Sequence, residues 1–222
     1  MKISHPLFST PFLLKEEAAN VIIIENGALF FSLMQEFSKQ CNGEDGSFVL
    51  SDSFSELPFS KYVDFVGDIF TFSINERKLS SKLISRISEK ALDDEHFAST
   101  AEILSAMEKY MLEVISDFDV SVHLENSVDI AMLLKAVPVS VSDPGATLPE
   151  KICNYAKTNF EFFGKSIFTF VNLKQFVSEE DLLEIYKFFR YEKLSLLLFE
   201  GYQKSIFRDE HILIIDKDMC II

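Results

Sequence analysis

The stretch from Lys165 to Glu200 constrains the fold more than any other part of the sequence, because two apolar segments flank a helical pattern there. Segments 166–171 and 194–199 have the length of strands and are apolar on both faces, as is typical of a parallel sheet covered by helices on both sides. Between them, Ser178 opens a capping-box-like start to a helix. Apolar residues then recur at helical spacing, at Leu182, Ile185, Phe188 and Phe189. The stretch predicts one βαβ unit with a right-handed crossover.

Length and charge set outer limits on what the chain can be. Its 222 residues are enough for one large domain or for one domain with an appendage. The formal net charge of −14, taken alone, argues against a nucleic-acid-binding protein. A local basic patch can oppose the overall charge, however, so the placement of the Lys and Arg residues decides this point.

Cysteine usage and the N-terminus indicate a cellular compartment. Cys41, Cys153 and Cys220 lie far apart, and no pair has the spacing of a metal or redox motif, so we expect reduced thiols. The N-terminal segment is broken by Pro6 and Pro11 and lacks the continuous apolar segment of a signal peptide. No run is long and apolar enough to span a membrane. These features predict a soluble, cytoplasmic protein with no membrane partner.

The remaining chain alternates between strand and helix patterns on both sides of a helical insertion. Runs of strand length occur at 10–14, 20–24, 48–50, 62–66 and 212–215, with an edge strand at 137–141 and an extended segment at 117–123. Helices are predicted at 27–41, at 128–136 and from residue 147 to about 163. Patterns 75–91 and 99–116 indicate two long helices, the second opened by the capping box Ser99–Glu102. We therefore predict an α/β head, residues 1–74 and 117–222, and an inserted α-helical leg, residues 75–116, that projects from it.

One tripeptide looks like the end of a phosphate-binding loop. Gly164-Lys165-Ser166 would need a glycine five positions earlier, where Asn159 stands, and it would have to follow a strand and open a helix. Here it follows a predicted helix and opens a strand, which is typical of a helix that ends on a glycine cap. The turn at 172–177 contains no glycine. A nucleotide-hydrolysing site is not supported.

The strongest local signal for binding is a row of cations in the first long helix. Lys78, Lys82, Arg86 and Lys90 are four apart, with Arg77 beside the first, and so stack along one side of a helix. One interpretation is a solvated face whose aliphatic stems cover the apolar edge. The other is a ridge that contacts nucleic-acid phosphates without reading sequence.

Acidic side chains gather after the second long helix, at Asp117, Asp119, Glu125 and Asp129. Oxygen ligands at irregular spacing suit calcium rather than zinc, but a solvated acidic loop is the commoner origin of such a cluster. The histidines and cysteines form no nucleophile, triad or metal-ligand spacing. The sequence therefore predicts no enzyme.

Three segments carry a resemblance to a known family. They are the N-terminal pattern Phe8, Pro11-Phe12 and 20–25, the segment 62–68 with 73–75, and the C-terminal third, IFTFVNLKQFVSEEDLLEIYKFF followed by LLLFE and Asp209-Glu210-His211. In these the chain resembles the small DNA-end-binding ring proteins of type II-A CRISPR–Cas systems, which take part in acquiring new spacers.

The resemblance implies a head related to P-loop NTPases but without their Walker motif, and a helical leg. It implies a homotetrameric ring that threads double-stranded DNA ends through a lysine-lined hole, with the integrase and the RNA-guided nuclease of the same locus as partners. Arg77 and the four-apart cations Lys78, Lys82, Arg86 and Lys90 then become candidates for the hole. Calcium binding is also implied, with Asp119 and Glu125 nearest the family's acidic run, although this chain has fewer carboxylates there.

Two functional hypotheses follow. The first is a non-catalytic ring that binds DNA ends. The alternative is a degenerate NTPase-like scaffold of the adaptation complex that acts only through other proteins and does not touch DNA. A metal-dependent nuclease would rest on the scattered carboxylates alone.

Overall fold

A computed structural model describes residues 1–53, 55–74, 77–142 and 145–222. The chain separates into two compact units, one made of Met1–Ile74 with Asp143–Ile222 and the other of Asn75–Ser142. The second unit extends to Ser142, whereas the sequence predicted that the leg ends at residue 116. The reason lies in α5 (Ile130–Ala136), which packs on α3 (Arg77–Ala91) and so belongs with the helical insertion.

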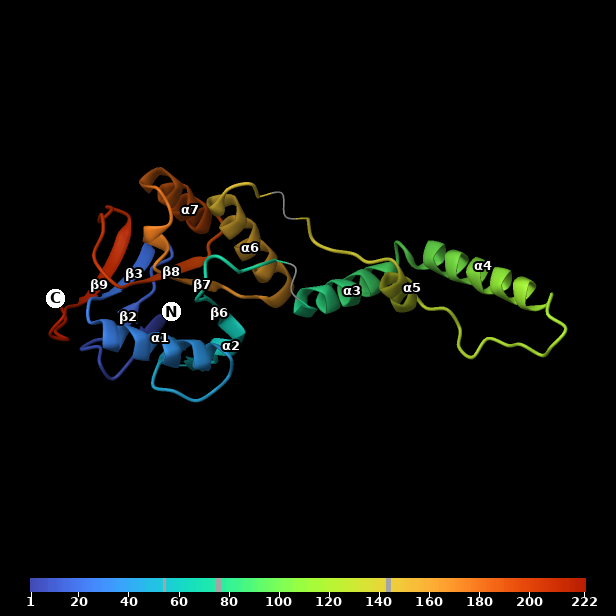
Figure 1. Ribbon diagram of the computed structural model, residues 1–222, viewed down its shortest axis with the longest axis horizontal. Helices are drawn as coiled ribbons and strands as arrows, with labels where there is room; N and C mark the ends of the chain where they lie inside the picture. Colours follow the sequence, from blue (N-terminus) through green and yellow to red (C-terminus); the bar gives the residue numbers. More distant parts are fainter. Residues whose placement is uncertain (54, 75–76, 143–144) are drawn as a thin grey trace. The chain divides into compact units, whose positions relative to one another are not determined.

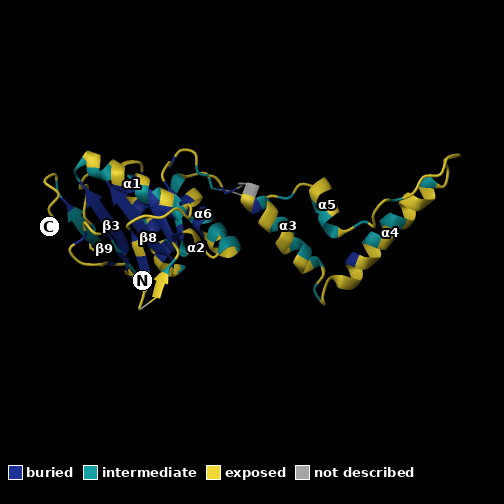
Figure 2. Cartoon of the chain, turned by 90° about the horizontal axis from the view of Figure 1, so that it is seen from below, coloured by how far each residue is buried: buried dark blue, intermediate teal, exposed yellow. Residues whose placement is uncertain are grey.

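A five-stranded sheet forms the centre of the first unit. Its order is β6-β7-β8-β3-β9, and every neighbouring pair is parallel. The strands are β3 (Ala19–Ile24), β6 (Val63–Val66), β7 (Ile167–Val171), β8 (Ser195–Glu200) and β9 (Glu210–Ile215). All residues of β3 and β8 are buried, as expected for central strands covered on both faces (Figure 2). The predicted α/β class and the βαβ unit at 165–200 are confirmed.

Helices cover both faces of this sheet (Figure 1). On one face lies α1 (Gly27–Cys41), where the ring of Phe37 meets that of Phe199 at 5.1 Å. On the other face lie α6 (Leu148–Phe163) and α7 (Glu179–Tyr191), which pack against each other, and Phe189 of α7 meets Phe168 of β7 at 5.8 Å. The two core layers follow from the alternation of side chains along each strand.

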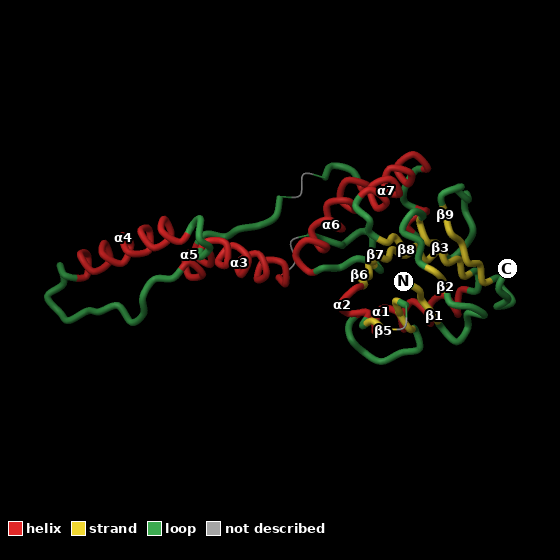
Figure 3. The backbone as a smooth tube through the Cα atoms, turned by 180° about the vertical axis from the view of Figure 1, so that it is seen from behind, coloured by secondary structure: helices red, strands yellow, loops and turns green. Residues whose placement is uncertain are grey.

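A second, antiparallel sheet extends the core on the α1 side. Its order is β2-β1-β4-β5, and the short helix α2 follows it (Figure 3). These elements are β1 (Lys2–Ser4), β2 (Phe12–Leu13), β4 (Val49–Asp52), β5 (Ser55–Leu57) and α2 (Phe59–Tyr62). Ile3 and Leu50 belong to the same hydrophobic cluster as Phe37 of α1. Strands of two or three residues such as β1 and β5 leave no periodicity in the sequence.

Three helix ends agree with the sequence. Thr147 and Glu150 form a complete capping box at the start of α6, and the Ser178 side chain accepts from the Asp181 N–H at the start of α7. Gly164 ends α6 in the left-handed region with φ 69°, which confirms that it is a helix cap. Lys165, beside it, donates to backbone carbonyls of the head rather than to a phosphate site.

The second unit contains α3, α5 and the longer helix α4 (Phe97–Ile115). The prediction that Ser99 caps α4 is wrong, because the helix begins at Phe97 and the carboxylate of Asp93 accepts from the N–H groups of Glu95 and His96 just before it. Thr100 then ties α4 to α3 by donating to the Ala91 carbonyl at 2.8 Å.

The predicted edge strand at 137–141 is also wrong. The N–H of Val137 bonds to Leu133 at the end of α5, and within the described residues no strand pairs with this segment. The segment 117–123 likewise has no strand partner among the described residues. Where the chain is described, no helix combines the length and the apolarity needed to cross a bilayer.

Candidate functional site

The cationic side of α3 is the first candidate site. Lys78, Lys82, Arg86 and Lys90 are all exposed, and they follow one another at the four-residue spacing that aligns side chains on a helix. The adjacent face is apolar, with Leu79 buried and Leu83, Ile84 and Ile87 half-buried. Arg77 begins the helix, but its side chain lies outside the described residues. We refer to Lys78, Lys82 and Arg86 as the α3 ridge.

Lys90 differs from Lys78 and Lys82 in its contacts. Its Nζ lies 2.7 Å from an Asp93 carboxylate oxygen and 3.6 Å from one of Glu95. The hydrogen bond to Asp93 raises the pKa of Lys90, and the bond from Lys90 lowers the pKa of Asp93. By contrast, neither Lys78 nor Lys82 makes an ion pair with any residue that the structure describes. The structure therefore distinguishes Lys90 from Lys78 and Lys82, with which the sequence grouped it.

One trio of potential metal ligands appears in the described part of the chain, at Asp93, Glu95 and His96, whose ligand atoms all lie within 4.8 Å of one another. The contacts of Asp93 explain this grouping without a metal. Its carboxylate accepts from two N–H groups of the turn, lies 2.8 Å from Nδ1 of His96 and pairs with the ammonium of Lys90. The trio is therefore the hydrogen-bonded turn between α3 and α4.

The residues predicted to bind calcium form no group of three potential ligands in the described part of the chain. Asp119 and Glu125 are both exposed in the segment between α4 and α5, and neither belongs to a ligand group of three within the described residues. Asp129, from the same acidic run, caps α5 by accepting from the Met132 N–H at 2.7 Å. Calcium takes six to eight oxygen ligands, so calcium binding by Asp119 and Glu125 stays a prediction.

A phosphate-binding loop would have to join a strand directly to a helix, and the turn from β3 to α1 makes such a connection. Only Glu25 and Asn26 separate the two elements. The Asn26 side chain accepts from the Leu29 N–H at 3.0 Å and donates to the Lys217 carbonyl at 3.1 Å. Its amide therefore caps the helix start, and the turn is too short for a glycine-rich loop that would surround phosphates.

A buried polar cluster in the head was missed by the sequence analysis. Nζ of Lys174 lies 2.6 Å from an oxygen of Glu210, and the Tyr186 hydroxyl donates to the same oxygen at 2.6 Å. Glu200 accepts from the Lys174 N–H at 3.0 Å, and burial raises the pKa of Glu200 to about 7. Glu200 follows an apolar run directly, and that position was the one available signal of its burial.

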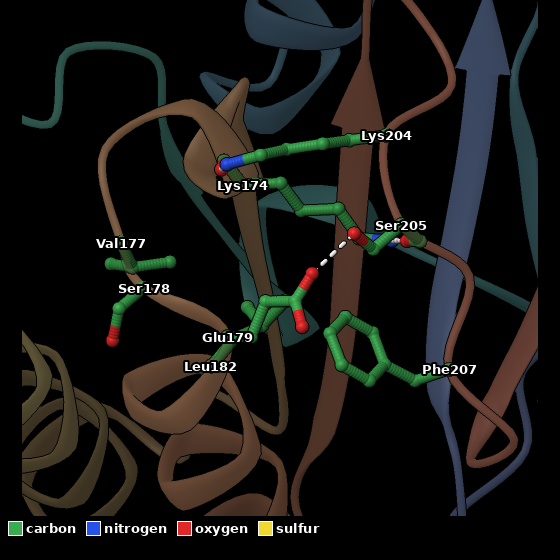
Figure 4. Close-up of a pocket in the computed structure, with 8 residues that line it drawn as sticks. All are labelled: Lys174, Val177, Ser178, Glu179, Leu182, Lys204, Ser205 and Phe207. Carbon is green, nitrogen blue, oxygen red and sulfur yellow. Dashed lines mark hydrogen bonds between the residues drawn. The ribbon is translucent and has the colours of Figure 1, made fainter.

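The loop 201–209 closes over this cluster. Lys204 donates to the Lys174 carbonyl at 2.6 Å, and Ser205 donates to Glu179 (Figure 4). The cavity between these side chains measures about 10 Å³, which is room for about one water molecule. The cluster is thus a polar contact that ties the loop to the elements around Lys174, and it leaves little room between its side chains.

Comparison with known proteins gives a family. Residues 40–219 match the family model described as CRISPR-associated protein (Cas_Csn2). Among solved structures, one similar chain is from Pyrococcus furiosus and is named as a putative ABC transporter (ATP-binding protein). It is 9% identical, the match covers 91% of this chain and 88% of that chain, and the TM-score is 0.38.

Proposed function

The chain belongs to the type II-A CRISPR-associated protein family Cas_Csn2, and from this premise we propose that it binds the ends of double-stranded DNA during spacer acquisition. On this proposal the protein acts as a homotetrameric ring, without catalysis and without reading sequence. Its partners are the integrase and the RNA-guided nuclease of the same locus.

The observation that carries the DNA-binding proposal is the α3 ridge. Its side chains are exposed, and Lys78 and Lys82 have no anionic partner within the described residues. Successive members are separated by about 6 Å along the helix axis, four residues at about 1.5 Å each. Duplex DNA carries a dense line of phosphate charge, so a cationic row of this kind supplies contacts that do not depend on base sequence.

A ring accounts for the overall charge. Closed symmetry repeats one modest cationic row in every copy, so a single helix can supply several rows around one duplex. The net charge of −14 then belongs to the other surfaces, where it opposes loose association with nucleic acid. Threading through a closed hole requires a DNA end.

A protein-interaction scaffold is the second candidate, and the exposed apolar residues of α4 favour it. Ile103, Tyr110 and Leu112 are each more than half exposed. Apolar side chains gathered on one exposed helix are typical of protein–protein contact surfaces. In a ring the same residues would meet another copy, so only a DNA-binding measurement separates the two candidates.

The experiment that tests the proposal is a gel shift that compares linear with closed circular DNA of one sequence. We expect the wild type to retain the linear form alone, and the variant Lys78→Glu/Lys82→Glu/Arg86→Glu to retain neither form. A matched control, Lys151→Glu/Lys157→Glu/Lys187→Glu, changes the net charge equally at exposed positions of α6 and α7 and should behave as the wild type.

Each other outcome is decisive. Equal retention of linear and circular DNA would indicate an open groove and would exclude threading. Wild-type protein that retains neither form at low salt would support the scaffold. Loss of retention in the control triple variant would show that total charge, and not the α3 ridge, drives binding.

A further inference from the structure

A hollow of about 190 Å³ opens in the head beyond the carboxyl ends of β6 and β7. Residues 67–70, which follow β6, form one wall. The other wall is formed by Val171, at the end of β7, and by Asn172, Gln175 and Phe176 after it. In α/β sheets this edge is the usual place for ligands. The hollow is smaller than the roughly 300–1,000 Å³ of typical small-molecule sites, so its size suits a single side chain better than a cofactor.

Two exposed phenylalanine rings line the hollow. Phe70 is 78% exposed and Phe176 is 45% exposed, and their ring centroids lie 4.9 Å apart in an edge-on arrangement. An edge-on pair leaves part of each ring face open to an incoming group. The face of an aromatic ring is electron-rich and attracts cations.

The polar groups of the hollow also favour a cation. Among the described residues that line it, Asp68 alone carries a formal charge. Hydrogen bonds from the Thr71 side chain at 2.7 Å and the Phe70 N–H at 2.8 Å hold the pKa of Asp68 below its usual value, so the group is anionic at neutral pH. A carboxylate has about four acceptor positions, so capacity is left for a ligand.

Neutral amides complete the lining. Gln175 is exposed, and its side chain makes no hydrogen bond to any described residue. Asn172 already accepts from the Gly201 N–H at 2.9 Å. With one carboxylate, an amide and two aromatic faces but no lining cation, the hollow disfavours phosphates and other anions.

We propose that this hollow is a docking site for an arginine side chain presented by a partner protein, with its guanidinium on Asp68 and its plane against Phe70. Arginine fits better than lysine, because a planar guanidinium stacks on an aromatic ring while its N–H groups bind a carboxylate in its own plane. The overall charge of −14 would attract a basic segment of such a partner. The inference does not depend on DNA binding by α3.

The test uses the absence of tryptophan from the chain. Phe70→Trp keeps an aromatic face and places a single indole at the hollow, where its fluorescence reports on bound groups. The full-length variant is titrated with N-acetyl-arginine amide, and then with N-acetyl-citrulline amide, which replaces the guanidinium by a neutral urea. One side chain should bind with a dissociation constant on the order of 1 mM.

We expect the citrulline compound to bind about tenfold more weakly or worse, because it lacks the charge-assisted hydrogen bond. Phe70→Trp/Asp68→Asn should lose a similar factor, whereas Phe70→Trp/Asp45→Asn, which changes an exposed acid in another loop, should not. Phe31→Trp serves as the control for non-specific quenching, since Phe31 is 68% exposed on α1.

Four results would overturn the proposal. Equal affinity for the arginine and citrulline compounds would show that the guanidinium is not recognised. An equal fluorescence response of Phe31→Trp would show that the compounds do not bind specifically at the hollow. Tighter binding of free L-arginine than of the blocked form would indicate a small-molecule site. Shielding of the Trp from acrylamide that increases with protein concentration alone would show that a second copy covers the hollow.

Discussion

At the scale of single residues, Lys174 shows most clearly how buried charges are stabilised in this head. The side chain is 3% exposed and the side chain of its partner Glu210 is fully buried, so both ions have lost their hydration. The loss is offset by the contact between them at 2.6 Å, by the Tyr186 hydroxyl on the same carboxylate and by the Ser205 carbonyl near the ammonium. A buried pair of this kind is sensitive to the removal of one partner.

Replacing Lys174 by methionine should therefore be strongly destabilising. Lys174→Met leaves Glu210 buried without a cation, and we expect the free energy of unfolding to fall by about 3–5 kcal/mol. Urea denaturation followed by circular dichroism, at one fixed protein concentration, measures the change. The double variant Lys174→Met/Glu210→Met should recover a large part of the loss. A double variant that is as unstable as the single one would contradict this explanation.

Glu200 should make the stability depend on pH. Its pKa is about 7 in the folded protein, raised by burial from an ordinary value of 4.5, so folding favours the protonated form. The contribution of Glu200 is complete below pH 4.5 and is lost as the pH rises through 7. Glu200→Gln keeps the acceptor for Lys174 and cannot ionise, so its advantage over the wild type should grow to about 3 kcal/mol across this window. A pH-independent difference between the two proteins would refute the assignment.

At the scale of elements, the sequence predicted what local periodicity and capping encode. Helix α1 was predicted with its observed bounds, and Thr147 and Gly164 mark the two ends of α6 as expected. These features depend on residues close together in the chain. The role of Lys90 and the start of α4 depend instead on how the turn after α3 folds around Asp93. The Lys174 cluster joins residues up to 36 positions apart, so no local pattern could reveal it.

The α3 ridge and Lys90 should respond differently to the same substitution. Lys82→Gln should lower the slope of log affinity against log salt by about 1 for each copy that contacts a phosphate. Lys90→Gln should leave that slope unchanged, because this ammonium is already paired with Asp93 and Glu95. Fluorescence anisotropy of a labelled linear duplex at several salt concentrations compares the two. Equal effects of both substitutions on the slope would show that Lys90 contacts DNA as well.

At the scale of the whole molecule, the insertion and the head draw on separate sets of contacts. All strands of both sheets lie in the first unit, together with the hydrophobic cluster around Phe37. The second unit is helical and has few buried side chains, among them Leu79 and Thr100. A body with a complete core of its own should fold without the insertion, whereas three helices with so little buried surface should not be stable alone.

Replacing residues 75–142 by a flexible glycine-serine linker should therefore leave a folded head. We expect a cooperative urea transition and the circular dichroism of an α/β protein, because both sheets and the Lys174 cluster keep every partner named above. The same protein should no longer retain linear DNA in the gel shift, since the α3 ridge is gone. Introducing Lys174→Met into the shortened chain should lower its stability by the same amount as in the full chain, which shows that the head is intact. Retention of DNA by the folded head would show that the DNA-binding surface lies outside α3. A non-cooperative urea transition would show that the head requires the insertion in order to fold.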